Sequence, residues 1–321
     1  MKKQILGMDI GGTKTAVVCA QEEDSNIKIT DKSVFKTTTA WDTIEHMIVE
    51  ANDMIRRNHL CLTDFTALGI SCGGPLDSQN GIIMSPPNLP GWKDIPIVEI
   101  MEKQFGIPCA LQNDANACAL AEWKYGAGAG TRNMVFLTFG TGLGAGLILD
   151  GKLYDGTNGN AGEIGHMRLS EFGPVGYGKQ GSFEGFASGS GIAQLAKAKL
   201  VERYQQGGNA DWCSYEKIGE VTAQIVAEQA QKGDEVALEV IQISALYLGK
   251  GLAVLIDLLN PECIVIGSIY ARNANLFYPI LENMLKKEAL KPSFEICRIK
   301  PAKLGDTIGD YAALSIASNI K

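Results

Sequence analysis

The chain has 321 residues, of which 45% are hydrophobic and 20% charged, and its net charge is −7 at neutral pH. At about 150 residues per domain, this length predicts two domains that each bury a core, which excludes a disulfide-stapled mini-protein and a disordered chain. The acidic balance and the lack of clustered lysine and arginine argue against nucleic acid as a partner. Of the 37 glycines, 19 fall between Gly126 and Gly191, and this concentration needs an explanation.

Targeting signals and cysteine usage narrow the setting. No apolar run approaches the roughly 18 residues of a membrane span, and the N-terminus lacks a signal-peptide pattern. We therefore expect a cytoplasmic protein with no membrane partner. Eight cysteines are scattered along the chain without a C-x-x-C pair, at positions 19, 61, 72, 109, 118, 213, 263 and 297. This usage predicts reduced, buried, structural cysteines.

The first part of the chain alternates predicted strands and helices. Residues 4–9 and 15–20 predict two strands joined by a turn at Gly11-Gly12. Apolar residues at helical spacing predict a helix over 41–58. The other expected elements are strands at 27–37, 67–71 and 109–112, a rigid proline-rich loop at 85–92, and helices at 97–105 and 116–125. This alternation indicates an α/β fold.

The second part begins with the same strand and glycine-turn pattern. Residues 133–138 predict a strand that enters the glycine turn 140–146 and leaves through 147–149. Two such hairpins, about 130 residues apart, suggest a weak internal duplication in which each hairpin opens a domain. After a glycine-rich loop at 150–191, we expect helices from 192 with a break at 207–208, a long helix at 235–259, a strand at 263–266 and a final helix at 310–319. The final helix could pack back on the first domain.

Both glycine turns follow strands, where backbone N–H groups can approach a phosphate without a Cβ in the way. Beside the first turn, Thr13 adds a hydroxyl donor, Lys14 a charge, and Asp9 a carboxylate able to hold a metal through water. An ordinary hairpin turn is the alternative, and the pattern is neither a Walker A loop nor a dinucleotide fingerprint. The second turn, at 138–144, has the same character, and two such turns in one chain favour phosphate binding.

The segment Asn113-Asp114-Ala115-Asn116 lies between the two glycine turns, follows a predicted strand and opens a helix. In the structural alternative, Asn116 is simply the N-cap and Asp114 lies in the preceding turn. A carboxylate at a strand end that faces a phosphate site is what a general base needs to take a proton from an attacking hydroxyl.

A third polar cluster lies in the glycine-rich loop. Glu163 and His166 are three residues apart and could be metal ligands on a helix, but Gly162 and Gly165 disfavour a regular helix. We expect an extended loop that presents both side chains to a polyhydroxy ligand. Glu184 is a further carboxylate, with a simple loop charge as its alternative.

Six segments in series resemble the ROK family of bacterial sugar kinases and repressors. They are Asp9 to Lys14, Pro87 to Trp92, Gln112 to Ala117, Phe139 to Gly146, Gly162 to His166 and Gly181 to Gly185. The resemblance implies a two-lobed hexokinase/actin-like (ribonuclease H-like) α/β fold, with ATP and a sugar in the cleft between the lobes and Mg²⁺ on the phosphates. We expect an N-terminal lobe at 1–120, joined by the helix at about 306–321, and a larger C-terminal lobe at 121–305 that carries the sugar loop and dimer helices.

The resemblance also implies roles for individual residues. Asp114 resembles the family's catalytic base. Sugar contacts are implied for Gly74, Asn88, Asn113, Asp114, Glu163, His166 and Glu184. Contacts to ATP are implied for Asp9, Gly11, Gly12, Thr13, Lys14, Gly140, Thr141, Gly142 and Gly267, and Asp9 would hold Mg²⁺ through water.

Two positions depart from the family pattern. The family usually holds zinc with the loop histidine and three cysteines, but the matching positions here are Val175, Tyr177 and Ser182, which supply no thiolate. We expect no zinc, a sugar-binding role alone for His166, and a loop at 173–191 held by packing of groups such as Phe172, Tyr177 and Phe183. In the second departure, Ser268 follows Gly267 where the family more often has three glycines near the adenosine.

Together these features predict ATP-dependent phosphorylation of a hexose hydroxyl, with O6 of glucose as the first choice. N-acetylmannosamine, allose, mannose, fructose and a β-glucoside stay open, since single loop changes redirect such pockets by only about 1–3 kcal/mol. A sugar-responsive repressor is the rival class, but only eight residues precede Asp9, too few for a helix-turn-helix domain. A catalytically silent sugar-binding or actin-like protein is a third possibility. The apolar helices after 235 and the family pattern favour a homodimer.

Overall fold

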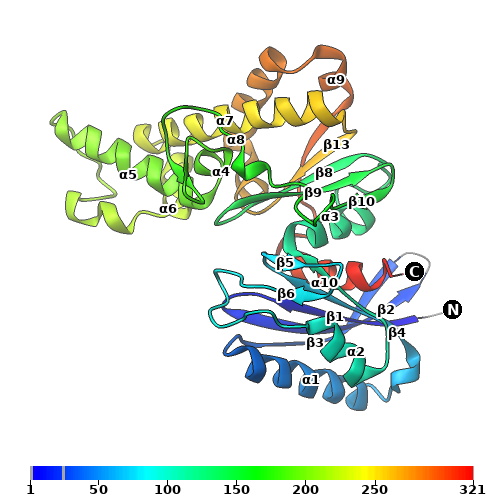
Figure 1. The fold of residues 1–321 in the computed structure, drawn as a ribbon. Coiled ribbons are helices and arrows are strands. Elements are labelled where there is room, and N and C mark those ends of the chain that lie inside the picture. The colour runs from blue at the N-terminus through cyan, green and yellow to red at the C-terminus, as the bar shows by residue number, and fades with distance from the viewer. Residues whose placement is uncertain (1–2, 24–25, 321) are drawn as a thin grey trace. The chain divides into compact units, whose positions relative to one another are not determined.

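The computed structural model describes residues 3–23 and 26–320, which form two compact units (Figure 1). Unit 1 comprises the described chain up to Gly130, Gly146–Ala161, and the described chain from Lys303. Unit 2 comprises Thr131–Ala145 and Gly162–Ala302. The lobe boundary expected at residue 120 falls inside helix α3 (Asp114–Tyr125), whereas the compact unit continues to Gly130.

Unit 1 is built on a five-stranded sheet in the order β3-β2-β1-β4-β7. The strands are β1 (Lys3–Ile10), β2 (Lys14–Glu23), β3 (Asn26–Lys36), β4 (Phe65–Cys72) and β7 (Cys109–Asn113). β2 pairs antiparallel with β1 and β3, while β1, β4 and β7 run parallel to one another. The strands and the first hairpin predicted from the sequence are confirmed.

Helices cover both faces of this sheet (Figure 1): α1 (Ala40–Arg57) and α2 (Ile97–Phe105) on one, α10 (Ile308–Ala317) on the other. Side chains alternate along β1, so that Leu6 and Met8 join the core under α1 and α2 while Ile5 joins the core under α10. The predicted return of the last helix to the first domain is thus confirmed. Gly69 on β4 permits this packing, because a Cβ there would lie 2.1 Å from the carbonyl oxygen of Ala313.

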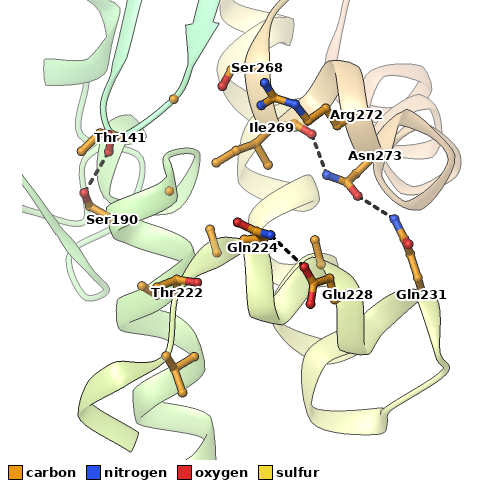
Figure 2. A pocket seen from close by; sticks show the side chains of 16 residues that line it. Thr141, Ser190, Thr222, Gln224, Glu228, Gln231, Ser268, Ile269, Arg272 and Asn273 are labelled. Atoms are coloured by element: carbon orange, nitrogen blue, oxygen red, sulfur yellow. Dashed lines mark hydrogen bonds between the residues drawn. The ribbon is translucent and has the colours of Figure 1, made fainter. Parts of the chain in front are cut away.

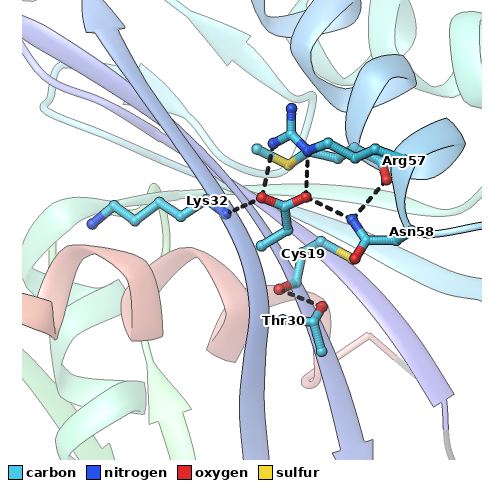
Figure 3. A network of polar contacts seen from close by, with 7 residues as sticks. Cys19, Thr30, Lys32, Arg57 and Asn58 are labelled. Atoms are coloured by element: carbon cyan, nitrogen blue, oxygen red, sulfur yellow. Dashed lines mark hydrogen bonds and ion pairs between the residues drawn. The ribbon is translucent and has the colours of Figure 1, made fainter.

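Asp31 on β3 ties the sheet to the end of α1. Figure 3 shows its partners Arg57 and Asn58. Arg57 donates Nε and Nη2 to its two carboxylate oxygens at 2.6 and 2.8 Å, and Asn58 donates Nδ2 at 2.6 Å. These hydrogen bonds, that of Arg57 above all, lower the pKa of Asp31. Close by, Thr30 donates its hydroxyl to the carbonyl of Cys19, at the point where the β2–β3 register shifts.

A second five-stranded sheet has the order β10-β9-β8-β13-β14. Its strands are β8 (Met134–Phe139), β9 (Leu143–Leu149), β10 (Lys152–Tyr154), β13 (Cys263–Ile266) and β14 (Arg298–Pro301). β8, β13 and β14 run parallel, as β1, β4 and β7 do in unit 1. The repeated strand order supports the predicted internal duplication. β14 is absent from the sequence prediction. It is a short edge strand whose one arginine, one lysine and one proline do not give the apolar pattern of a buried strand.

The helices of unit 2 are α4 (Phe183–Phe186), α5 (Gly189–Gln205), α6 (Ala223–Gln231), α7 (Glu235–Leu259), α8 (Ser268–Glu288) and α9 (Lys291–Ile296). The bounds of α7 and β13 match the prediction, whereas α6, α8 and α9 were not delimited by it. By length and composition α7 could cross a membrane, but 61% of its most apolar stretch is buried, as in a core helix. Asn273 interrupts α8 with φ −133° and ψ 27°.

Shorter elements complete the chain. They are β5 (Leu76–Asp77), β6 (Ile82–Ile83), β11 (Val175–Gly176), β12 (Lys179–Gln180) and 3₁₀ turns at Leu62–Asp64, Ile164–His166, Tyr215–Glu220 and Gly305–Thr307. None of the eight cysteines, all within the described residues, forms a disulfide, and five are buried. The prediction of burial is wrong for Cys61, which is exposed because it begins the exposed first 3₁₀ turn.

Candidate functional site

In unit 1, the predicted site residues gather where three parallel strands end. Asp9 lies near the end of β1, Gly74 follows β4, and Asn113 ends β7 immediately before Asp114 begins α3. The carboxyl ends of parallel strands share one edge of a sheet, where ligands of α/β proteins commonly bind. The fold therefore brings these side chains to one place in unit 1.

The first glycine turn is fixed from two sides. Thr37 donates its hydroxyl to the carbonyl of Gly11 at 2.7 Å, and the Gly11 N–H donates to the carbonyl of Lys14 at 3.1 Å. A Cβ on Gly12 would lie 2.5 Å from the carbonyl oxygen of Asn88, so the proline-rich loop lies directly against the turn. Glycine is required there by this close approach, and Thr13 and Lys14 stay exposed at the tip. The contribution of Thr37 was not predicted.

Asn113, not Asn116, caps helix α3. Its side-chain oxygen accepts a hydrogen bond from the Asn116 N–H at 2.7 Å, which places Asp114 in the first helical turn. Although solvent reaches Asp114, protein around it desolvates the carboxylate and raises its pKa, against the opposing hydrogen bond from the Ala115 N–H. A raised pKa makes this carboxylate a stronger base.

Asp9 lies in an acidic neighbourhood. Burial, and then the charges of Asp114 and Asp310, raise the pKa of Asp9 to about 6, while a hydrogen bond from Ser71 and the charge of Lys32 oppose the shift. Lys32 forms an ion pair with Asp310 at 2.6 Å, across 278 positions of the chain. Because that pair depends on the return of α10 to the sheet, no local sequence signal indicates it.

In unit 2, the second glycine turn and the sugar loop are in contact. Glu184 accepts a hydrogen bond from the Leu143 N–H at 3.0 Å. A Cβ on Gly165 would lie 2.3 Å from the Leu143 carbonyl oxygen. A Cβ on Gly162, which has φ +90°, would lie 2.1 Å from the Ala145 carbonyl oxygen. Glycines are needed here because the loop lies directly on β9.

The prediction of an extended loop around Glu163 and His166 is wrong, because the chain forms a single 3₁₀ turn over Ile164–His166. Both side chains are exposed. Glu163 is the N-cap of this turn and His166 is its last residue. The difference arises because three residues suffice for a 3₁₀ turn, whereas the two glycines disfavour only a longer helix.

The prediction of how the cysteine-free loop 173–191 is held is partly wrong. Phe172 is 80% exposed and does not anchor it. Tyr177 is 73% exposed, but its ring meets that of His166 edge to face, with the ring centroids 5.2 Å apart. Phe183 is fully buried, as predicted, and packs against Gly251 of α7, where a Cβ would lie 2.2 Å from the ring.

Hydrogen bonds hold the rest of this loop. Gln194 on α5 accepts from the Val175 N–H at 3.0 Å and donates to the Val175 carbonyl at 2.8 Å. Lys179 donates to the carbonyl of His166 at 2.6 Å, and Arg168 donates to that of Gln180 at 2.8 Å. The backbone carrying His166 is therefore tied to the loop by side chains that the sequence did not indicate.

A pocket of about 880 Å³ lies wholly within unit 2 (Figure 2). Gly140 and Thr141 of the glycine turn, Ser190 of α5, and residues of α6 and α8 line it. Its polar lining consists of Thr141, Ser190, Thr222, Gln224, Glu228, Gln231, Ser268, Arg272 and Asn273. This volume falls within the roughly 300–1,000 Å³ of ligand sites.

Hydrogen bonds order the pocket walls (Figure 2). Gln231 donates to Asn273 at 2.9 Å across α6 and α8, and Gln224 donates to Glu228 at 2.9 Å. Gly267 is not among the lining residues; a Cβ there would meet the ring of Phe136 at 3.2 Å. Its neighbour Ser268 does line the pocket, and its φ of 50° is one that glycine adopts more readily.

The donors present fit a magnesium nucleotide better than a caged metal. Among residues 3–23 and 26–320, no group of three or more His, Cys, Asp or Glu side chains could hold a metal ion. Mg²⁺ usually binds through one or two carboxylates together with substrate phosphates and water. Asp9, close to the first glycine turn, supplies one such carboxylate.

Comparison with known proteins assigns the chain to a family. The sequence matches the ROK family over residues 5–320. The chain belongs to this family. It is 33% identical over 311 residues to a glucokinase of Halalkalibacterium halodurans, covering 95% of this chain and 92% of that protein. A ROK hexokinase structure from Thermus thermophilus superposes with a TM-score of 0.81 at 30% identity, covering 98% of both chains.

Two further relatives show the range of the family. A ROK glucokinase from Streptomyces griseus, solved with glucose and AMPPNP, has a TM-score of 0.73 at 27% identity and covers both chains fully. A xylose repressor of Caldicellulosiruptor bescii is 29% identical over 94% of this chain and 75% of its own length. The expected two-lobed ROK fold is thereby confirmed, and the glucokinase and hexokinase relatives support a sugar kinase.

Proposed function

We propose that this ROK protein transfers the γ-phosphoryl group of ATP to a hexose hydroxyl, with glucose and its O6 as the first expected acceptor. The observation that carries the proposal is Asp114, an accessible carboxylate of raised pKa at the start of α3, in a chain with two glycine turns. The Streptomyces griseus relative, solved with glucose and an ATP analogue, supports the pairing of substrates.

In this mechanism Asp114 accepts the hydroxyl proton while the sugar oxygen bonds to the γ-phosphorus and the bond to the leaving ADP oxygen breaks. The N–H groups of the two turns, with the Thr13 hydroxyl and the Lys14 ammonium, bind phosphate oxygens. Asp9 would hold Mg²⁺ through water, and the bound ion would neutralise charge on the phosphates.

The pocket of unit 2 is proposed to take the nucleoside of ATP. It begins at Gly140 and Thr141, so a nucleoside in it would place its phosphates at the second glycine turn. Asn88, Asn113, Glu163, His166 and Glu184 are proposed as sugar ligands, and Gly74 as part of the same site. Glu184 also fixes the second turn through Leu143, which couples sugar and phosphate contacts within unit 2.

A coupled kinase assay over a panel of hexoses tests the proposal, with N-acetylmannosamine, allose, mannose, fructose and a β-glucoside beside glucose. Asp114→Asn should lower kcat by about 10²-fold or more, because the proton acceptor is lost, and leave sugar binding within a few fold. Asp42→Asn removes an exposed carboxylate from the first turn of α1 and serves as the control. Near-normal turnover of Asp114→Asn would sink the assignment.

The repressor relatives make DNA binding the function to be excluded experimentally. The net charge of −7 favours the kinase. A cytoplasmic location, a homodimer and a zinc-free loop stay predictions of the same proposal.

A further inference from the structure

Glu122 is a fully buried carboxylate in the last turns of α3. One oxygen accepts hydrogen bonds from the N–H groups of Lys303 and Leu304 at 2.9 and 2.8 Å. The other accepts from the N–H of Ala127 at 2.7 Å. A buried charge needs such partners, because it has lost its water. The sugar-kinase mechanism above leaves this carboxylate without a role.

The three donors lie beside two of the four places where the chain passes from one unit to the other. The first passage follows Gly130, three residues beyond Ala127, and the last precedes Lys303, while the other two passages flank the segment Gly146–Ala161. Glu122 therefore fastens the first and the last passage to one end of the same helix. Backbone donors from segments far apart in the sequence meet on a single side chain.

Unit 2 holds its side of the same passages. Glu262 accepts from the N–H groups of Arg132 and Asn133 at 2.8 and 3.0 Å. Ala302 donates its N–H to the carbonyl of Ile266 at 2.9 Å. In the first passage, the Gly128 N–H also donates to the Glu122 backbone carbonyl at 3.0 Å, so Gly130 and Thr131 follow the last amides held on the unit 1 side. In the last passage, the Ala302 N–H is held in unit 2 and the next N–H, that of Lys303, is held in unit 1.

The first passage contains a residue suited to rotation. Gly130 has φ +85°, and nothing lies within 4 Å of the position a Cβ would take. Glycine changes φ and ψ with little steric penalty. The first passage can therefore change direction at Gly130, between an amide held in unit 1 by Glu122 and amides held in unit 2 by Glu262.

Helix α3 connects this point to the proposed base. Asp114 and Glu122 are eight residues apart on the same helix, about 12 Å at 1.5 Å per residue. We infer that Glu122 is a positioning residue of phosphoryl transfer, which sets the direction of Asp114 relative to the first and the last chain passage through α3. The inference rests on the proposed kinase function for its kinetic part only.

The test compares wild type with Glu122→Gln, which keeps the shape and one acceptor oxygen but replaces the other with an NH₂ group. An NH₂ group cannot accept from a backbone N–H, so one passage is released. We expect kcat to fall about 10-fold or more, since small misplacements of reacting groups are costly. KM for sugar and for ATP should change less than about 3-fold, since Glu122 contacts neither by the proposal. More ATP should be hydrolysed per sugar phosphorylated.

A second readout is independent of activity. In Glu122→Gln, hydrogen exchange should be about 10-fold faster or more at the passage that faces the new NH₂ group, which is either the peptide containing Ala127 or the one containing Lys303 and Leu304, while the strands of unit 1 exchange as in wild type. If the wild-type chain phosphorylates no hexose, the kinase proposal fails, and this exchange experiment still decides whether Glu122 fastens the passages.

Asp31→Asn is the matched control. Like Glu122, Asp31 is a carboxylate of unit 1 that accepts several hydrogen bonds, three of them from the side chains of Arg57 and Asn58, but it lies on β3, away from α3. Asp31→Asn should lower Tm without changing the ratio of sugar phosphorylation to ATP hydrolysis. If Glu122→Gln does not fold, hydrogen exchange of the wild type decides, and the amides of Ala127, Lys303 and Leu304 should then exchange as slowly as those in the strands of unit 1. The inference is overturned if these wild-type amides exchange as fast as exposed loop amides, if a folded Glu122→Gln exchanges them as wild type does, or if its kinetics match those of Asp31→Asn.

Discussion

Replacing Asp9 with asparagine should stabilise the protein while impairing its activity. Burial and two neighbouring carboxylates raise the pKa of Asp9 to about 6 from its ordinary value of 3.8. At neutral pH the Asp9 carboxylate is therefore ionised in the folded state, where its free energy is higher than in the unfolded chain. Asparagine keeps the shape and can still accept a hydrogen bond from Ser71, but it has no charge.

The magnitude follows from the two pKa values. Their difference, 6 − 3.8 = 2.2, at 1.36 kcal/mol per pKa unit corresponds to about 3 kcal/mol at pH 7.5. The folded pKa lies above the unfolded one, so the folded state binds more protons between them and stability falls as pH rises through this window. The advantage of Asp9→Asn should thus shrink to about 1.5 kcal/mol at pH 5 and vanish below pH 3.8.

The assay is thermal or urea unfolding of wild type and Asp9→Asn between pH 4 and 8, followed by a probe of unit 1. For a unit of this size, about 3 kcal/mol corresponds to a Tm increase on the order of 6–12 °C at pH 7.5. Asp42→Asn, at the exposed start of α1, should change stability by less than about 0.5 kcal/mol at every pH. A destabilised Asp9→Asn, or a gain that does not depend on pH, would refute the reasoning.

Two further predictions concern unit 2. Ala193→Phe should fill the pocket and raise KM for ATP about 10-fold or more in steady-state kinetics, with KM for sugar nearly unchanged. Its control, Ala198→Phe on the exposed side of α5, should alter neither KM. Equal effects of the two variants would show that the nucleoside does not bind in this pocket. Gln194→Leu deletes both hydrogen bonds to Val175, each worth about 1 kcal/mol, and should raise KM for sugar about 3- to 10-fold with kcat within twofold. Gln206→Leu, at the exposed end of the same helix, is its control, and an unchanged sugar KM in Gln194→Leu would show that the loop needs no such tie.

The elements that sequence patterns predicted well are those whose neighbours are local. β1 and β2 follow from two apolar runs around a glycine turn, and α7 follows from a long apolar segment without glycine clusters or proline. β14 was missed, and α6 was not delimited within the helices expected from 192, because their stability comes from packing in unit 2 rather than from their own composition.

The site divides in the same way. Asp114 and the glycine turns could be identified from the sequence because short, contiguous motifs contain them. Glu122 could not be found from the sequence, because a glutamate in a helix is expected to be solvated. Its partners, the N–H groups of Lys303 and Leu304, come from a distant part of the chain that only the fold brings into contact with it. The burial of Phe183 and the exposure of Phe172 also depend on which helix lies across the loop, which composition does not specify.

The most direct test of the account is transfer of labelled phosphate from γ-labelled ATP to glucose by wild type and Asp114→Asn, with the position of the product phosphate determined by NMR. We predict a phosphate on O6 with wild type and a rate lower by about 10²-fold or more with Asp114→Asn, while glucose binding persists. Transfer to no hexose in the panel, or equal transfer by both proteins, would contradict it.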